Sequence, residues 1–277
     1  MISYNILYLN VNDYIPALKV FCKAMGFEEE EIQNDMISSV KMFYGHNNFI
    51  GIGIKKSTEK DYVGFGSLIP YKNTAWIPYV GIEPAIQKQG LGRLIMDQLI
   101  KIALKNNWET IELCASDAGI SLYNNLGFTN DYKASIYKIV NCSENPSENL
   151  NVSNTFPEWI YSLDKEVLGT NRKNIFHIHK YNQLTIISKE NEGYGIIYGK
   201  RIGPVIANYP ELAKDIFKTA IKHGAETVVL VEKDNAKTDF FSFMELELVI
   251  STRKMTYGKA LLQDVKRIFG LRSLAYG

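Results

Sequence analysis

The sequence has few cysteines, no long apolar run and almost no net charge. Its three cysteines, Cys22, Cys114 and Cys142, lie far apart and cannot form a framework of disulfides, so we expect reduced thiols and a cytoplasmic protein. No stretch of about 18 apolar residues occurs, and residues 1–10 lack the pattern of a signal peptide, so neither a membrane span nor secretion is predicted. The 31 basic and 30 acidic residues nearly cancel, so charge gives no reason to expect nucleic acid or a membrane as a partner.

The sequence also lacks the clustered ligands of a metal site. His177 and His179 would share one face of a strand, but no group of cysteines or carboxylates near them completes a ligand set. We therefore expect no metal.

The length of 277 residues suggests two domains, and a hydrophobic fraction of 46% is ordinary for a globular protein. The segment 141–155, NCSENPSENLNVSNT, is polar and contains Pro146, as a linker would. The sequence thus predicts a first domain over 1–140, a linker over 141–155 and a second domain over 156–277.

Hydrophobic spacing in the first domain predicts alternating strands and helices. The longest helix is expected over 91–105, where apolar residues recur every three to four positions. The other expected elements are strands at 2–9, 49–54, 62–69, 74–82 and 110–115, and helices ending near residue 24 and spanning 118–125. This order predicts an α/β domain with a mixed, partly parallel sheet.

The second half of the chain contains a segment that is similar in sequence to one in the first half. DQLIKIALKNNWETIEL (97–113) aligns without gaps on KDIFKTAIKHGAETVVL (214–230), an offset of 117, with six of seventeen positions identical. Two amphipathic helix–strand units could look alike by patterning alone, but we interpret the match as a duplication of half a domain.

The chemically informative segment is TAWIPYVGIEPAIQKQGLGR (74–93), in which a predicted strand leads through a turn into the long helix. Gly90 and Gly92 lack a Cβ, so the backbone can curl and bring several N–H groups to one anion. The start of a helix adds unpaired N–H groups and the positive end of its dipole. The segment is therefore typical of a pyrophosphate site, although a glycine-rich helix entry with no ligand is the alternative.

Two familiar phosphate motifs do not fit this turn. The Walker loop needs G-x-x-x-x-G-K-[ST], and the dinucleotide fingerprint would need glycine where Ile95 stands. What remains is Q-x-x-G-x-G, formed by Gln87, Gly90 and Gly92.

This pattern resembles the signature of the GNAT superfamily of acyl-CoA-dependent N-acetyltransferases, [R/Q]-x-x-G-x-[G/A] at the start of a helix. The resemblance continues through ELCASDAGISLYNNLGF (112–128), which is similar to the closing stretch of that family, and it covers about residues 2–140. The resemblance implies a GNAT fold followed by a second, partial GNAT-like domain, as in the subgroup with a C-terminal acetyltransferase-like domain. It also implies acetyl-CoA as the cosubstrate.

The resemblance assigns residues to the cosubstrate. Backbone groups of one strand would pair with the pantetheine arm, the following turn would hold the pyrophosphate, and Tyr123 would donate a proton to the CoA sulfur. The residues implied in binding are Val80, Gly81, Ile82, Gln87, Lys88, Gln89, Gly90, Leu91, Gly92, Arg93 and Tyr123.

The general base is less clearly indicated. An amine with a pKa near 10.4 is neutral in only about one molecule in 2500 at pH 7, so a base is useful. Glu83, just after the strand, is the predicted base, and Tyr79, Glu112 and Asp117 are alternatives that the sequence leaves open.

The second half departs from the motif where phosphate would bind. The segment 208–211 (NYPE) stands in place of Gln87–Gly92 and has no glycine pair, so this half is expected to bind no CoA and to close the acceptor side of the cleft. In the segment 163–174, Asp164 and Arg172 are candidate acceptor contacts, with a helix-surface ion pair as the alternative.

The resemblance implies transfer of an acetyl group to a primary amine of a small molecule or peptide, by direct attack in a ternary complex. The alternative is a GNAT-fold protein that binds an acyl-CoA as a sensor or partner module without turnover. The intact turn at 87–92 and Tyr123 favour the enzyme.

Overall fold

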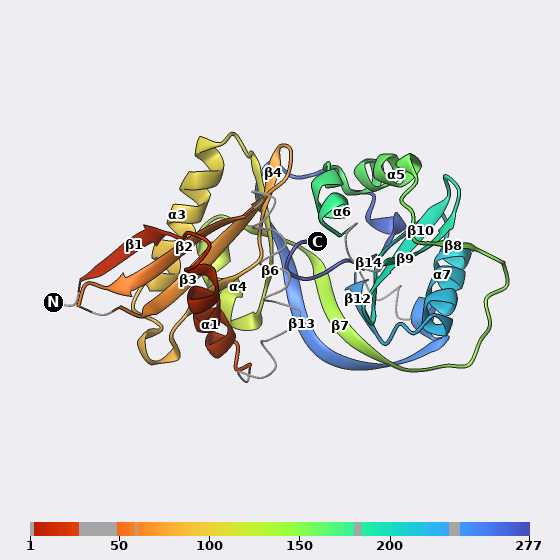
Figure 1. The fold of residues 1–277 in the computed structure, drawn as a ribbon, viewed down its shortest axis with the longest axis horizontal. Coiled ribbons are helices and arrows are strands. Elements are labelled where there is room, and N and C mark those ends of the chain that lie inside the picture. The colour runs from red at the N-terminus through yellow and green to blue at the C-terminus, as the bar shows by residue number, and fades with distance from the viewer. Residues whose placement is uncertain (1–2, 28–48, 59, 180–183, 233–238) are drawn as a thin grey trace.

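The computed structural model describes residues 3–27, 49–58, 60–179, 184–232 and 239–277. Two lobes lie side by side and are joined through the middle by two long strands, and the C-terminal residue lies near the centre (Figure 1). No helix within the described ranges is both long and apolar enough to cross a membrane.

The first half alternates strands and helices largely as predicted. Its elements are β1 (Tyr4–Tyr8), α1 (Tyr14–Ala24), β2 (Ile50–Lys56), β3 (Tyr62–Pro70), β4 (Thr74–Ile77), β5 (Val80–Ile82), the 3-10 turn η1 (Pro84–Ile86), α3 (Leu91–Lys105), β6 (Thr110–Ala115), α4 (Asp117–Asn125) and β7 (Thr129–Cys142). The predicted bounds of the helix at 91–105 and the strand at 110–115 are confirmed.

The second half follows a similar alternation of strands and helices and adds a final strand. Its elements are β8 (Asn151–Ser153), α5 (Glu158–Leu168), α6 (Lys173–His179), β9 (Leu184–Lys189), β10 (Gly193–Tyr198), β11 (Arg201–Ala207), α7 (Pro210–Lys222), β12 (Thr227–Glu232), η3 (Asp239–Phe241), β13 (Met244–Gly258), η4 (Val265–Arg267) and β14 (Ile268–Leu271).

Two local predictions were wrong. The expected single strand over 74–82 is broken into β4 and β5 at Pro78, because proline has no N–H to donate to a neighbouring strand. His177 and His179 lie in helix α6 rather than on a strand. The Asn171 side chain accepts a hydrogen bond from the Lys173 N–H at 3.0 Å, which favours a helix start at that point.

The core of the first half lies on both faces of its sheet. The apolar side of α3, including Ile95, Leu99 and Ile102, packs on one face together with residues of β2 and β6. Helix α1 packs on the opposite face through Ala17 and Leu18. The sheet is therefore buried on both sides, which holds its strands in a fixed frame for the site at their ends.

The two halves share one continuous sheet, with the strand order β1-β2-β3-β4-β6-β13-β7-β12-β14-β11-β10-β9-β8. Strand β13, from the second half, lies between β6 and β7 of the first, and β7 in turn pairs with β12 of the second. Each half therefore supplies a strand to the sheet of the other. The division at 140 and 156 stays an interpretation of the sequence.

The offset of 117 residues extends to these shared strands. β6 and β12 are related by it at both ends, and β7 and β13 overlap when it is applied. β7 and β13 pair antiparallel with each other, and Ser135 donates a hydrogen bond to Ser251 at 3.2 Å between hydroxyls near the middle of the pairing. This arrangement is that of two copies related by an approximate twofold axis, which supports the interpretation as a duplication.

Candidate active site

The sheet opens where β4 gives way to β5. β4 runs parallel to β6 with its last pair at Ile77 and Leu113, whereas β5 pairs only with β3 among the described strands. The N–H of Ser67 donates to the carbonyl of Tyr79, and the N–H of Glu83 donates to the carbonyl of Val63. Backbone groups alternate in direction along a strand, so those of Val80 and Ile82 point to the unpaired edge.

Helix α1 fixes the position of β5 from behind. A Cβ built on Gly81 would lie 2.5 Å from the Cα of Phe21 in α1, so only glycine permits this close approach. The predicted pantetheine segment, 80–82, therefore presents one backbone edge to the opening while its other edge is held by β3.

The predicted pyrophosphate turn follows directly. Lys88 and Gly90 both have positive φ, 62° and 84°, and Gly90 is the residue that precedes the first turn of α3. The Gln87 side chain donates a hydrogen bond to the carbonyl of Ile82 at 3.1 Å, which fastens the turn to the end of β5. Gln87 thus has a structural contact that its place in the motif alone did not reveal.

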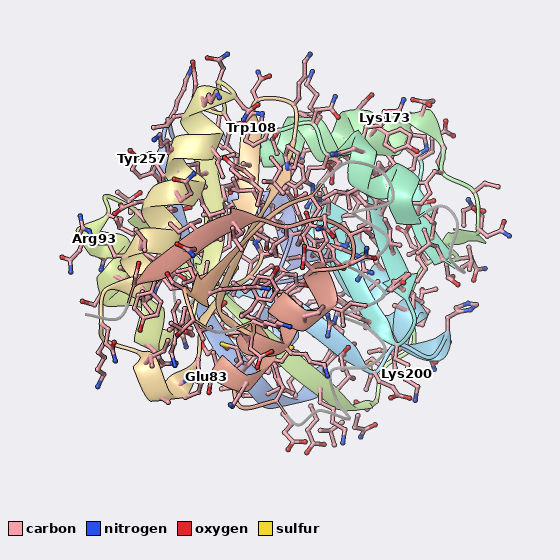
Figure 2. All side chains as sticks on the ribbon, turned by 60° about the vertical axis from the view of Figure 1, so that its left-hand side comes forward. Glu83, Arg93, Trp108, Lys173, Lys200 and Tyr257 are labelled. Atoms are coloured by element: carbon pink, nitrogen blue, oxygen red, sulfur yellow. The ribbon has the colours of Figure 1, made fainter. Side chains whose placement is uncertain are left out.

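Within the described residues, the backbone amides of this turn have no hydrogen-bond partners. The N–H groups of residues 88–93 make no hydrogen bond to any part of the chain that the structure describes, and Leu94 is the first to donate within the helix, to the carbonyl of Gly90. Successive unpaired N–H groups at a left-handed turn and a helix start form a concave anion site. Arg93 points outward from the first turn of α3 (Figure 2).

The two glycines serve different purposes. A Cβ on Gly90 would meet nothing within 4 Å, so glycine is favoured there by the positive φ rather than by space. A Cβ on Gly92 would lie 3.4 Å from the side chain of Leu122 in α4. This distance is an ordinary van der Waals contact, so α3 lies beside the helix that carries Tyr123 but the packing does not itself require glycine at 92.

Tyr123 lies on α4, beside the first turn of α3. A Cβ on Gly119 would lie 2.7 Å from the Tyr123 ring, so the ring folds back over the preceding turn of α4, toward the end of β6. Its hydroxyl makes no hydrogen bond within the described residues, and burial raises its pKa to about 12. The phenol is therefore a protonated, unengaged donor at neutral pH. Sequence analysis did not single out Gly119, although a glycine inside a short helix is itself a signal.

Glu83, the predicted base, lies at the end of β5. Its carboxylate forms an ion pair with Lys23 at 2.6 Å, and 22% of the side chain is exposed. Both residues border a cleft of about 810 Å³ beside the C-terminal end of α1. Figure 2 shows Glu83 on the lower surface of the first half, away from Arg93 in that view.

The other three candidate bases have different surroundings. Glu112 is fully buried and forms an ion pair with Lys254 of β13 at 2.5 Å. Tyr79 is buried against Phe21, and burial raises its pKa well above the usual range. Asp117 is exposed in the first turn of α4. Of these, only Asp117 is accessible without disturbing the core.

Asp164 and Arg172 form an interior pair rather than a surface one. The Arg172 guanidinium donates to Asp164 twice, from Nη2 at 2.7 Å and from Nε at 3.2 Å, and the Tyr194 hydroxyl donates to the same carboxylate at 2.5 Å. Both side chains are almost completely buried. The loop between the two residues contacts the start of β4, where the hydroxyls of Thr170 and Thr74 lie 3.1 Å apart.

In the second half, the space that corresponds to the opening of the first half is filled by strand β14. β11 and β12 begin as parallel neighbours, and β14 then enters between them, pairing with both. Tyr209, which precedes α7, has an extended backbone with φ of −147°. Both the split between strands and the left-handed turn are thus absent from this part of the described structure. Among the described residues, no group of three potential metal ligands occurs.

Comparison with protein families gives matches in both halves. Residues 13–128 match the model of the acetyltransferase (GNAT) family, and residues 160–270 match an acetyltransferase (GNAT) domain. Two relatives are each described as an uncharacterized N-acetyltransferase ycf52. The one from Porphyra purpurea is 32% identical over 126 residues, which is 44% of this chain and 67% of the relative. The one from Gracilaria tenuistipitata var. liui is 28% identical over 130 residues, 45% of this chain and 68% of the relative.

Solved structures share the arrangement of both halves. A crystal structure named as that of an acetyltransferase from Pyrococcus horikoshii covers 99% of this chain and 96% of its own, with a TM-score of 0.88 and 24% identity. A GCN5-related N-acetyltransferase from Sphaerobacter thermophilus covers 94% of this chain and 97% of its own, with a TM-score of 0.62 and 11% identity. These likenesses show the fold, two GNAT units in tandem.

Proposed function

The chain belongs to the GNAT acetyltransferase family and is an acyltransferase, and from this premise we propose that it moves an acetyl group from acetyl-CoA to a primary amine. The acceptor is a small molecule or a peptide, and the reaction is a direct attack within a ternary complex. The cytoplasmic location inferred from the cysteines stays a prediction.

One observation carries this proposal. Among the described residues, the edge of β5 has no partner strand and the amides of residues 88–93 have no hydrogen-bond partner, and the two surfaces follow each other along the chain at the opening in the sheet. An extended thioester arm ending in a pyrophosphate needs this sequence of surfaces: backbone hydrogen bonds along the arm, then several N–H donors for the diphosphate. The amides need no metal, since they and the helix dipole supply the positive potential.

The reaction balances without a further reagent. The neutral amine donates its lone pair to the thioester carbonyl carbon, the C–N bond forms, and the C–S bond breaks. The amine loses one proton and the CoA sulfur gains one, so the products are an amide and the free thiol. Neutralising a lysine-like amine at pH 7 costs about 4.6 kcal/mol, which a base near the acceptor would offset.

Tyr123 is proposed as the donor to the leaving sulfur. The hydroxyl is protonated at neutral pH, has no competing hydrogen bond within the described residues, and is directed toward the end of β6 by the contact of its ring with Gly119. A phenol placed in this way stabilises the thiolate as charge develops on sulfur.

Glu83 is proposed as the base, acting directly or through water. It stands at the end of the strand that the thioester arm would follow, and its partner Lys23 keeps the carboxylate oriented. The second half would close the acceptor side, with Asp164 and Arg172 holding its first two helices against β4 from inside the protein.

The experiment compares two substitutions at Gly90 that differ in backbone preference. Gly90→Val introduces a β-branched residue that avoids positive φ, whereas Gly90→Asn introduces a residue that tolerates it. Space does not distinguish them, because a Cβ at this position meets nothing. We expect Gly90→Val to weaken acetyl-CoA binding by about tenfold or more, and Gly90→Asn to bind nearly as wild type.

Binding is measured by calorimetry and turnover by thiol release across a panel of amines. Equal affinity of folded Gly90→Val and wild type would contradict the proposed binding turn. Tight binding of acetyl-CoA by the wild type without acceptor-dependent thiol release would instead favour the sensor or partner module.

A further inference from the structure

Residues 273–277 of the second half lie against the first half. The segment follows β14, and within the described structure it forms no strand pairing. The carbonyl of Tyr276 accepts a hydrogen bond from the Tyr71 hydroxyl at 2.7 Å. A Cβ built on Gly277 would lie 3.0 Å from the Trp76 ring, so the backbone of Gly277 rests on the indole. Figure 1 shows residue 277, marked C, in the middle of the molecule between the two lobes.

The segment covers the face of the sheet that carries α1. Ala275 and Tyr276 pack in one apolar cluster with Tyr79, and the same cluster contains residues of α1. The apolar side chains of α3 belong to a different cluster, on the opposite face of the sheet. The second half therefore covers the first on the face away from α3, the helix that begins at the turn proposed for the pyrophosphate.

The same cluster lies beside the opening in the sheet. The last pair between β4 and β6 is Ile77 with Leu113. Beyond this pair, Tyr79 stands on one side of the opening and Cys114 on the other, and both pack in the cluster that contains Tyr276. Tyr276 is 5% exposed and Tyr79 is 6% exposed. The α1 face of the opening is therefore covered by packed side chains.

An amine and acetyl-CoA need different faces of this opening. The proposed pyrophosphate turn leads into α3, so the cosubstrate would approach from the α3 face. Its arm would follow β5 to bring the thioester to the opening, and the amine would then attack from the α1 face. That route is occupied in the structure by Tyr276 and its neighbours.

We propose that residues 273–277 are a lid on the acceptor side of the opening, in its closed position in this structure. When closed, the lid keeps water from the thioester, and it opens to admit the amine. This inference rests on the proposed function, because the face assigned to the amine follows from the site assigned to acetyl-CoA. Arg272, directly before the lid, lies 4.4 Å from the ring centroid of Tyr198, a contact that holds the start of the lid in the second half.

The first test weakens the closed position through one hydroxyl. Tyr71→Phe removes the hydrogen bond to the Tyr276 carbonyl and keeps the ring. The net effect of one such bond shifts a two-state equilibrium by about two- to tenfold. Because a lid that is open more often binds the acceptor more readily, we expect the KM for the amine to fall by this factor and the KM for acetyl-CoA to stay unchanged. Tyr14→Phe is the matched control, since the Tyr14 hydroxyl makes its buried hydrogen bond in the same cluster with the Gly51 N–H rather than with the lid.

A second variant removes the ring that covers the opening. Tyr276→Ala should increase the hydrolysis of acetyl-CoA in the absence of an amine by about threefold or more, because water then reaches the thioester. In this reaction water attacks the carbonyl carbon, the C–S bond breaks, and the products are acetate and the free thiol. Tyr8→Ala, at an exposed position of β1, is the control and should leave hydrolysis unchanged.

Trp76 reports the position of the lid without any turnover. In a background of Trp108→Phe and Trp159→Phe it is the one tryptophan left, and in the closed position it is only 3% exposed. Quenching of its fluorescence by acrylamide should therefore be weak in this background. We expect the quenching constant to rise about twofold or more when Tyr71→Phe is added, and to stay unchanged when Tyr14→Phe is added.

Three results would overturn the lid: equal quenching of Trp76 in the Tyr71→Phe and Tyr14→Phe proteins, a KM for the amine that does not fall in Tyr71→Phe, or hydrolysis by folded Tyr276→Ala that is no faster than by Tyr8→Ala. A wild type that releases no thiol with any amine would instead contradict the proposed function. The quenching comparison needs no turnover, so it would still decide whether residues 273–277 open.

Discussion

Lys254 and Glu112 come from opposite halves of the chain and form a buried ion pair at 2.5 Å, with each side chain only 2% exposed. Lys254 also reaches Asp131 of β7 at 2.6 Å. One ammonium group therefore contacts carboxylates of β6 and β7 from its own strand, β13. These are the strands through which the sheets of the two halves are joined. The strand that completes the first half is held in register by this contact as well as by backbone pairing.

Removing Lys254 should destabilise the protein strongly. Lys254→Met leaves Glu112 and Asp131 facing each other without a cation, and breaking a buried pair in this way costs about 3–5 kcal/mol. Lys259→Met is the control, because Lys259 is on the surface and its carboxylate partner is 3.9 Å away. We expect it to change the free energy of unfolding by no more than about 0.5 kcal/mol. Chemical denaturation measures the free energy of unfolding of both variants. A loss of stability below about 1 kcal/mol for Lys254→Met would contradict a strongly stabilising role of this ion pair.

The same pair predicts how stability depends on pH. Burial alone would lower the pKa of Lys254, but the neighbouring carboxylates Glu112 and Asp131 raise it above its usual value. Its stabilising effect is therefore complete below the unfolded pKa of about 10.4 and is lost as pH rises toward the folded value. The stability difference between wild type and Lys254→Met should shrink from pH 10 to 11.5. A constant difference across that range would show that the folded pKa is not raised.

Tyr123→Phe should reduce turnover while leaving the cosubstrate bound. The hydroxyl has no structural hydrogen bond within the described residues, so its loss has little effect on stability. Loss of a proton donor at the leaving group lowers kcat by about 100-fold, with the KM for acetyl-CoA nearly unchanged. Tyr257→Phe is the matched control, because both rings pack against Phe128. Similar kcat values for the two variants would contradict the role of Tyr123 as proton donor to the leaving sulfur.

Much of the first half was predictable because its signals are local. The helix over 91–105 is set by apolar spacing, and the turn before it is favoured by Gly90, whose tolerance of positive φ does not depend on distant residues. The relation between 97–113 and 214–230 was also visible as a repeated string. In such segments, sequence and tertiary structure favour the same conformation.

The pairing of strands was not predictable in the same way. Nothing local in 244–258 indicates that this strand joins β6 rather than its own half, or that 268–271 enters between β11 and β12. The burial of Asp164 and Arg172 was missed for a related reason, because a helix-surface ion pair and an interior one have the same sequence pattern. Only the packing of Tyr194 against them distinguishes the two.

Gly119 should be required for catalysis although it does not touch the cosubstrate. Gly119→Ala places a methyl group 2.7 Å from the Tyr123 ring, so the ring must turn away from its position. The substitution itself favours the helix by up to about 1 kcal/mol, so stability should change little. We expect kcat to fall toward that of Tyr123→Phe, with acetyl-CoA affinity retained. Ser121→Ala, on the exposed side of α4, is the control and should leave both quantities unchanged.

The filled opening of the second half predicts one acetyl-CoA per chain. In the first half the edge of β5 is unpaired, whereas in the second the corresponding space is taken by β14, which pairs with Val205 and Ile206 on one side and with Val229 and Leu230 on the other. Displacing β14 would expose a buried strand, Ile268–Leu271, and break its backbone hydrogen bonds, so a second molecule cannot enter at ordinary concentrations.

Calorimetry should therefore give a stoichiometry near one, and Gly90→Val should weaken all of the binding rather than half of it. A second, weaker site that persists in Gly90→Val would show that the degenerate half still binds the cosubstrate. The converse experiment uses Tyr209→Gly, which supplies a flexible residue before α7 without opening the strands. It should create no second site, because the turn supplies donors for a diphosphate but the arm has no unpaired edge to follow.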